Sequence, residues 1–463
     1  MSYAVCADIG STFTKVALVA LPSGRLLATG AHPTTVDTDV LHGLDSAAAR
    51  AAAHAGDAAG VDPKASWYVC SSAGGGLRLA VVGHEQLVTA QAGRRVALSA
   101  GARVVHVAAG KLSGKDVASL DAAQPDIVLL VGGTDGGEAD TLLHNAGMLA
   151  RAGRRRPVVL AGNADAREQA TAVLTRTGTP VRATANVLPR IGQLHPAPAR
   201  AAIREAFLRH VIGGKRLSRG PRLAGLLRTA TPDAVLAAVE LLADHDHGDL
   251  LVADVGGATT DVYSAVTPDT DLDRGRDADA EVAGVLARAR TVEGDLGVRW
   301  SAPGVVAAAI DENLLASGEA EALTAAAGQR AAAPGLVAAE AVARAHDHRL
   351  AGLAAVVAVR RHARGDTPGP VRRGGRDLRR VRTVIGSGGV LRHAEHPEQL
   401  LATVVSDHAG GWAPPQRAYT VVDTRYVLAA AGLLAGDHPR AALRLLRDDL
   451  PVGDLPGGEP AHG

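Results

Sequence analysis

Two stretches of the sequence repeat one pattern, in which an aspartate ends an apolar strand and a glycine turn follows. They are CADIGSTFTKVALV, which contains Asp8, and VADVGGATTDVYSAV, which contains Asp254. In both, small or hydroxyl residues follow the glycine and a second apolar strand begins. A carboxylate at a strand end is costly to bury unless it binds something, most economically a hydrated cation. The pattern therefore predicts two similar β-hairpins whose tips hold a ligand.

The turns of these hairpins also suit an anion. Glycine and small hydroxyl residues leave backbone N–H groups bare, and such groups form a cradle for phosphate. Lys15, seven residues after Asp8, adds a positive charge for the same purpose. Two facing hairpins of this kind would hold a magnesium polyphosphate from both sides.

A third glycine turn, IGSGGVLRH at 385–393, follows the two hairpins. Its glycines let the backbone lie against a planar or ribose-bearing ligand, and a helix follows. It is neither a Walker A loop nor a dinucleotide-binding fingerprint, because the residues and spacings of both are missing. Each turn alone is more simply a connection between strands. Their order, with separations of 254 − 8 = 246 and 386 − 254 = 132 residues, favours one shared site.

This ordered set resembles the phosphate-1, phosphate-2 and adenosine motifs of the acetate and sugar kinase, heat-shock chaperone and actin superfamily. The resemblance implies an α/β fold of two RNase H-like domains, the actin-like ATPase fold, with ATP and Mg²⁺ in the cleft between them. Asp8 would position the metal and Asp254, also a metal ligand, would orient the attacking water. Asp261 would polarise water, orient the second loop or serve as a structural cap. The nucleotide contacts implied are those of Gly10, Ser11, Thr12, Lys15, Gly256, Gly257, Thr259, Gly386, Ser387, Gly388 and Gly389.

A narrower resemblance extends from about residue 3 to residue 435. LLVGGTDGGEADTLLHNAGMLA, VVLAGNADA, TVEGDLGVRWSAPGV (291–305) and VIGSGGVLRH are together similar to the glutamate (methylaspartate) mutase accessory family. TVEGDLGVRWSA is the most specific piece, because the broad superfamily motifs do not require it. Members are thought to be ATP-dependent reactivating chaperones of the adenosylcobalamin-dependent mutase. The resemblance thus implies ATPase activity that drives domain motion, and mutase subunits as the partner.

Cobalamin itself is not an expected ligand. Its usual base-off signature, Asp-x-His-x-x-Gly, requires an aspartate two residues before a histidine, and no histidine of the sequence has one. The groups DHDHGD (244–249) and HDH (346–348) are interpreted as solvated residues in preference to metal ligands. Cys6 and Cys70 lack the spacing of an iron–sulfur activator, and Cys6 is most simply a core residue.

Two other functions of the superfamily stay open. A metabolite kinase would need a carboxylate base aimed at a bound hydroxyl, and Asp261, or Asp135 if its loop reaches the cleft, is the best candidate. The other is an actin-like structural ATPase, although nothing in the sequence speaks to polymerisation. The sequence also leaves open the roles of Thr134, Asp135, Glu293 and Asp295.

The composition limits the kinds of partner that are expected. Lys plus Arg (49) nearly balance Asp plus Glu (48), and aromatic residues make up 2%, so neither nucleic acid nor a membrane is expected as a partner. There is no signal-peptide pattern and no apolar run long enough to span a membrane, so we expect a cytoplasmic protein. Whether it forms a homo-oligomer stays open.

Alternation of strand and helix patterns predicts the organisation of the chain. ASWYVCSSAGGGLRLAVVG is predicted to form two strands with Gly74–Gly76 as the turn, and 197–246 to be mostly helical. Residues 267–281 and 363–380 are predicted to be exposed linkers. The predicted domains are 1–246, the first ATPase domain with inserted α/β and helical segments; 247–415, the second; 416–450, a helical segment that packs back on the first; and 451–463, a flexible tail.

Overall fold

A computed structural model describes most of the chain. The described residues are 2–56, 66–73, 77–85, 89–90, 92–93, 96–97, 102–207, 209, 217–267, 288–316, 318–364, 376–407, 409 and 414–450. The predicted turn Gly74–Gly76, most of the linkers at 267–281 and 363–380, and the tail 451–463 lie outside them.

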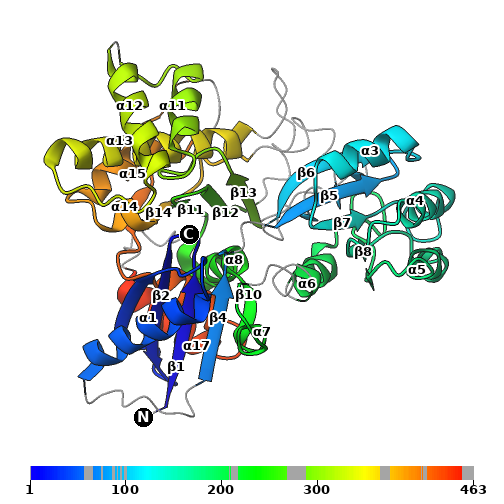
Figure 1. Cartoon of the computed structure of the whole chain (residues 1–463), viewed down its shortest axis with the longest axis horizontal. Coiled ribbons are helices and arrows are strands. Elements are labelled where there is room, and N and C mark those ends of the chain that lie inside the picture. Colours follow the sequence, from blue (N-terminus) through cyan, green and yellow to red (C-terminus); the bar gives the residue numbers. More distant parts are fainter. Residues whose placement is uncertain are drawn as a thin grey trace, which may run out of the picture.

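The first lobe is built on a five-stranded sheet in the order β10-β4-β1-β2-β3 (Figure 1). Its first three strands form an antiparallel meander, β4 pairs parallel with β1, and β10 pairs parallel with β4. Helix α1 (Val40–Ala55) packs on one face through Val40, Leu44 and Ala47. The strands are β1 (Tyr3–Ile9), β2 (Phe13–Ala20), β3 (Leu26–Pro33), β4 (Ser66–Ser71) and β10 (Leu227–Ala230).

The second lobe repeats this topology in a sheet of order β13-β12-β11-β14-β15. Here too three antiparallel strands are followed by two parallel ones, which is the strand arrangement of RNase H-like domains. The predicted pair of RNase H-like domains, the actin-like ATPase fold, is confirmed. The elements are β11 (Leu250–Val255), β12 (Thr260–Ala265), β13 (Arg288–Glu293), β14 (Thr383–Ser387), β15 (Tyr419–Val422), α11 (Ala302–Asp311), α12 (Glu319–Ala332), α13 (Ala341–Arg364), α14 (Gly389–Arg392) and α15 (Pro397–Ser406).

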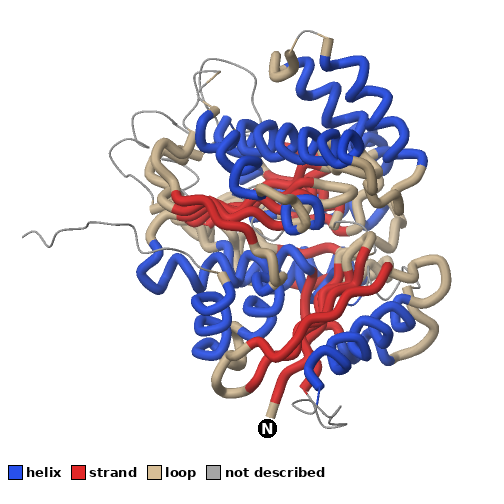
Figure 2. Tube along the Cα trace, turned by 90° about the vertical axis from the view of Figure 1, so that its left-hand side faces the viewer, coloured by secondary structure: helices blue, strands red, loops and turns tan. Residues whose placement is uncertain are grey.

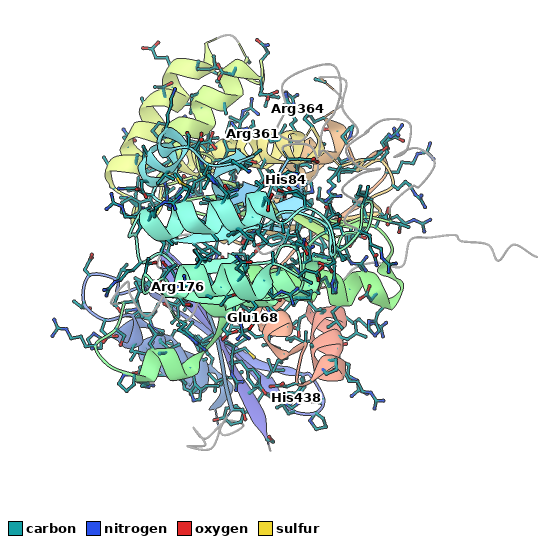
Figure 3. All side chains as sticks on the ribbon, turned by 90° about the vertical axis from the view of Figure 1, so that its right-hand side faces the viewer. His84, Glu168, Arg176, Arg361, Arg364 and His438 are labelled. Atoms are coloured by element: carbon teal, nitrogen blue, oxygen red, sulfur yellow. The ribbon has the colours of Figure 1, made fainter. Side chains whose placement is uncertain are left out.

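An insert separates β4 from β10 and lies beside the two lobes at the right of Figure 1. Its five parallel strands have the order β6-β5-β7-β8-β9, and one face of the sheet shares a buried core with the first lobe. Figure 3 views the molecule from this side, with Glu168 in α5 of the insert, Arg176 just after that helix, and His438 in the first lobe below. The elements are β5 (Arg78–Gly83), β6 (Arg103–Ala109), β7 (Ile127–Leu130), β8 (Val158–Leu160), β9 (Val181–Ala183), α3 (Gly114–Ala122), α4 (Asp140–Arg151), α5 (Arg167–Thr175), α6 (Pro196–Ala206) and α7 (Arg222–Leu226).

The insert changes two of the sequence-based expectations. The two strands expected around Gly74–Gly76 exist as β4 and β5, but they belong to different sheets and do not pair with each other. The region 197–246, predicted to be mostly helical, also contains β10, the fifth strand of the first lobe. An apolar strand pattern reports burial and not the sheet in which the strand is buried, so neither result was visible in the sequence.

The chain passes between the lobes twice. Helix α8 (Thr231–Leu242) continues into a π-helical turn, Ala243–His247, that leads to β11. After β15, helices α16 (Val427–Leu434) and α17 (Pro439–Asp449) return to the first lobe. These helices fill the space between the two sheets and share a buried core with both (Figure 2).

We expect His362 to make the second lobe sensitive to acid. Its ring, on α13, is 2% exposed and hydrogen-bonds with the hydroxyls of Ser264 at 2.8 Å and Thr291 at 3.0 Å. Burial, assisted by the charge of Arg376, lowers the pKa of His362 from 6.5 to about 3. Between those values the unfolded chain binds the proton and the folded chain does not. The stabilising contribution is therefore complete above pH 6.5 and is lost as the pH falls toward 3.

Urea unfolding measures this effect. Between about pH 7.5 and about pH 5, the wild type should lose about 2 kcal/mol more unfolding free energy than His362→Gln, which cannot take up the proton. His396→Gln removes an exposed histidine and should behave as the wild type. Equal acid losses in all three proteins would contradict the prediction.

Candidate functional site

The two Asp hairpins have turns of matching geometry. The N–H of Gly10 donates to the carbonyl of Phe13 at 3.1 Å, and the N–H of Gly256 donates to the carbonyl of Thr259 at 2.9 Å. A Cβ at either glycine would lie 2.8 Å from that carbonyl oxygen. Both turns therefore require glycine for its small size, and each places its remaining N–H groups at the tip.

The tips of the hairpins meet. A Cβ on Gly257 of the second turn would lie 3.0 Å from the hydroxyl oxygen of Thr12 in the first. That hydroxyl is buried and has no hydrogen-bond partner among the described residues. A buried hydroxyl without a partner costs free energy that a bound oxygen ligand would recover. Ser11, beside it, is partly exposed at the same tip.

Asp8 lies near the C-terminal end of β1, and three side chains contact its carboxylate. The hydroxyl of Thr231 donates to its Oδ1 at 2.6 Å, the thiol of Cys70 lies 3.7 Å from the same oxygen, and Nζ of Lys15 lies 3.6 Å from Oδ2. Thr231 begins α8 and was missed by the sequence analysis, because only the folded chain brings the start of that helix to β1.

Asp254 occupies the equivalent place in the second lobe, between Asp261 on β12 and Ser387 on β14. Burial raises its pKa to about 6; the charge of Lys15 opposes that rise, and the charges of Asp261 and Asp8 add to it. Burial alone would lower the pKa of Lys15. The interactions of its ammonium group with Tyr426, Asp8 and Asp254 outweigh burial and raise that pKa. Lys15 is therefore in electrostatic contact with the aspartates of both hairpins and stays protonated.

Asp261, beside Asp254, forms a buried ion pair with Arg290. Its Oδ1 accepts a hydrogen bond of 2.9 Å from Arg290, which is 3% exposed, and its Oδ2 lies 3.5 Å from the hydroxyl of Thr259. Burial raises the pKa of Asp261, while the charge of Arg290 opposes that rise. Of the roles left open for Asp261, this ion pair favours orientation of the second hairpin.

The third glycine turn closes against the second hairpin. Gly388 has φ = 111°, and a Cβ there would lie 2.1 Å from the carbonyl oxygen of Val255. A Cβ on Gly386 would lie 3.0 Å from the methyl groups of Leu401, which is tight but less so than at Gly388, and Gly389 faces the hydroxyl of Tyr426. The structure thus brings all three turns together, although they are far apart in the sequence.

The segment TVEGDLGVRWSA packs against the turn of the second hairpin. The N–H of Val298 donates to Gly256 at 3.0 Å, and those of Arg299 and Trp300 donate to Gly257 at 2.8 and 2.9 Å. A Cβ on Gly297 would lie 2.2 Å from the carbonyl carbon of Ala258. Of these contacts, the one at Gly297 requires a particular residue, because any residue except proline could supply the three backbone N–H groups.

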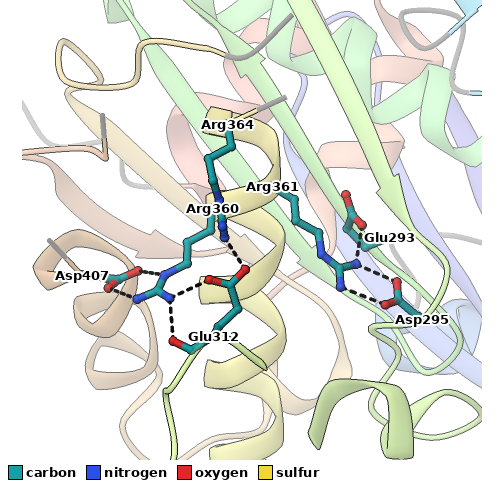
Figure 4. Close-up of polar contacts among 7 residues, drawn as sticks. All are labelled: Glu293, Asp295, Glu312, Arg360, Arg361, Arg364 and Asp407. Atoms are coloured by element: carbon teal, nitrogen blue, oxygen red, sulfur yellow. Dashed lines mark hydrogen bonds and ion pairs between the residues drawn. The ribbon is translucent and has the colours of Figure 1, made fainter. Parts of the chain in front are cut away.

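The acidic residues with open roles are engaged locally. Arg361 binds both Glu293 and Asp295 at 2.8 Å, within the second lobe (Figure 4). In the insert, Asp135 accepts hydrogen bonds of 2.9 Å from Asn186 and from the N–H of Ala164, so its side chain holds two loops of the insert. Thr134, next to Asp135, accepts the N–H of Gly137 at 3.0 Å through its carbonyl and so closes a turn.

A cavity of about 530 Å³ adjoins the first hairpin. Asp8 and Lys15 line it together with the basic residues Arg50, His54, Arg392 and Arg425, and with Tyr426. Arg392 stands within the third motif and could have been proposed from its position there. Tyr426 gave no signal, because it precedes an apolar helix at a distance from every motif. The cationic lining suits a polyanion.

Within the described residues, no group of three or more His, Cys, Asp or Glu side chains is arranged to hold a metal ion. A magnesium ion at Asp8 and Asp254 would have only these two protein carboxylates, and would take its remaining oxygen ligands from phosphate and water, as Mg²⁺ commonly does. No helix in the part of the chain that the structure describes is long and apolar enough to cross a membrane.

Comparison with known proteins gives a family match over nearly the whole chain. A family model described as "MutL protein" matches residues 4–450. "Protein MutL" of Clostridium tetanomorphum is 34% identical over 466 residues, which cover 95% of this chain and 97% of that protein. Among solved structures, nucleotide-free acetone carboxylase is 15% identical with a TM-score of 0.40, covering 94% of this chain and 70% of its own. Glycerol dehydratase reactivase is 13% identical with a TM-score of 0.36, covering 94% and 100%.

Proposed function

The chain belongs to the MutL protein family, and on that premise we propose that it is an ATP-dependent accessory protein that reactivates an adenosylcobalamin-dependent glutamate (methylaspartate) mutase. The observation that carries the ATP part is that the three glycine turns lie against one another beside Asp8, Asp254 and Lys15, with Gly257 next to Thr12 and Gly388 next to Val255. The mutase part rests on the family resemblance of the sequence.

The chain's own residues have distinct tasks in this proposal. Asp8 and Asp254 bind the magnesium ion from opposite lobes, and the N–H groups of the two turns and Lys15 bind the phosphates. The hydroxyl of Thr12, without a partner in the described structure, donates to a phosphate oxygen. Mg-ATP supplies the transferable phosphoryl group. Asp254 is ionised near neutral pH, and in that form it accepts a hydrogen bond from the attacking water and orients it.

Each lobe contributes one hairpin, so phosphate binding couples directly to the arrangement of the lobes. Nucleotide stabilises the arrangement in which both tips contact the phosphates, and hydrolysis removes part of that stabilisation. A partner that binds the two arrangements with different affinity is then driven through a cycle. In this proposal the partner is the mutase, and the cycle releases damaged cobalamin from it.

Calorimetry with Mg-ATP and Mg-ADP tests the site. We expect micromolar binding by the wild type and a loss of at least about 100-fold, or about 2.7 kcal/mol, in the Asp8→Ala/Asp254→Ala variant, because both metal ligands are removed. Asp135→Ala removes an aspartate from a glycine loop of the insert and should leave the affinity unchanged. Unfolding curves establish that each variant is folded. A folded wild type that binds neither nucleotide would overturn the proposal.

A second assay separates the accessory function from the two alternatives. A mutase inactivated by damaged cobalamin should recover activity when this protein, ATP and fresh coenzyme are added, and should not recover with the double variant. Saturable phosphorylation of a small acceptor would support a kinase instead. ATP-dependent sedimentation without any effect on a mutase would support a structural ATPase.

A further inference from the structure

One aromatic ring lies against two cationic side chains beside Asp8. The Nζ atom of Lys15 lies 4.1 Å from the centre of the Tyr426 ring, and Cζ of Arg392 lies 4.6 Å from the same centre. The three residues come from different parts of the chain: Lys15 from β2 of the first lobe, Arg392 from α14 of the second, and Tyr426 from the turn that returns to the first lobe. Tyr426 also lines the cavity beside Asp8.

Lys15 and Arg392 both place a positive charge against one ring. An anion would stabilise these two charges more strongly than the ring does. The ring attracts each cation through its quadrupole, whereas the cations repel each other. A phosphate would bring a full negative charge to the same ammonium and guanidinium groups. Ring and phosphate therefore compete for the charge of Lys15.

The backbone holds Tyr426 in a strained position. Its φ is 57° and its ψ is 44°, the left-handed region that residues with a Cβ rarely adopt. The carboxylate of Asp423, which is 1% exposed, fixes the turn by accepting the N–H groups of Val427 at 2.9 Å and Leu428 at 3.0 Å. A change at Tyr426 would therefore be transmitted to the start of α16.

We propose that Tyr426 is a latch on the nucleotide site: its ring occupies the phosphate position on Lys15 when no nucleotide is bound, and the phosphates of the nucleotide expel it. This inference rests on the proposed ATP binding and adds a residue and a coupling to it. Because Tyr426 immediately precedes α16, its expulsion changes the start of the helix that packs against α8 and the first-lobe sheet. Phosphate binding is thereby linked to the connection between the lobes.

Calorimetry on Tyr426 variants tests the latch. Tyr426→Leu removes the ring that competes for Lys15, so Mg-ATP should bind about 3- to 30-fold more tightly, the range expected for loss of a cation–π contact. Tyr426→Phe keeps the ring and should bind within about 2-fold of the wild type. With Lys15→Met already present, Tyr426→Leu should give a smaller gain, because of the two cations on the ring only Arg392 remains.

Hydrogen exchange gives an independent readout. Mg-ATP should speed the exchange of the first amides of α16 in the wild type and leave them unchanged in Tyr426→Leu, where they exchange fast from the outset. If the wild type binds Mg-ATP and Tyr426→Leu binds it equally or more weakly, the latch is overturned and ATP binding stands. If neither folded protein binds, the latch and the proposed function are both overturned.

Discussion

Replacing Gly432 with alanine is expected to destabilise the protein by about 3 kcal/mol or more, although alanine is the better helix former. Gly432 lies in α16 where that helix passes closest to α8. A Cβ added there would lie 1.7 Å from the carbonyl oxygen of Ala234 and 2.5 Å from its carbonyl carbon. Both atoms belong to the backbone, so no side chain can turn aside and the two helices must separate.

A matched substitution isolates this effect. Gly328 lies within α12, and a Cβ there would meet nothing within 4 Å. Gly328→Ala should therefore stabilise the protein by up to about 1 kcal/mol, through helix propensity alone. Urea unfolding of the two variants should give changes of opposite sign. Stabilisation of both would mean that α16 and α8 can separate at little cost.

Replacing Asp347 with alanine should cost about 3–5 kcal/mol, because it leaves a buried cation without its partner. Asp347, on α13, accepts a hydrogen bond of 2.5 Å from Arg330 and two, at 3.1 and 2.8 Å, from Arg299. Arg330 is 1% exposed and cannot recover its hydration by turning outward. Arg299 also donates its N–H to Gly257, so the loss should loosen the support of the second hairpin.

Glu319→Gln is the control for Asp347→Ala. Its partner, Arg349, lies two residues further along α13, and both side chains are more accessible, at 27% and 38%. An accessible pair of this kind contributes at most about 1 kcal/mol. Denaturant unfolding should therefore separate the two variants by about 2 kcal/mol or more. Similar losses would contradict the view that burial sets the cost.

The features predicted well from the sequence are those that local chemistry determines. The strand, glycine turn and strand of each Asp hairpin lie within a few residues, so hydrophobic pattern and turn residues suffice to recognise them. The two-lobed fold was implied by the resemblance of three such local features, in their order, to the motifs of a known superfamily.

The features that escaped prediction depend on contacts between distant residues. β10, with the sequence LRTA, has three half-exposed residues and one exposed residue, and becomes a strand because β4 offers an unpaired edge. Thr231 and Tyr426 reach the site only because α8 and α16 begin there. Asp261 was expected among the catalytic residues, and its pairing with Arg290 depends on β13, which lies beyond a long charged segment in the sequence.

The two connections between the lobes also determine how one lobe can move relative to the other. Two points of attachment define a line, and rotation of one lobe against the other is expected about that line, with α8, α16 and α17 packed between the two sheets. One point is the π-helical turn Ala243–His247, and the other is the turn at Asp423–Val427. In such a lever, displacement grows with distance from the axis. A small displacement at the glycine turns would therefore accompany a larger displacement at the ends of the molecule, where the insert and the helices α11–α13 lie (Figure 1).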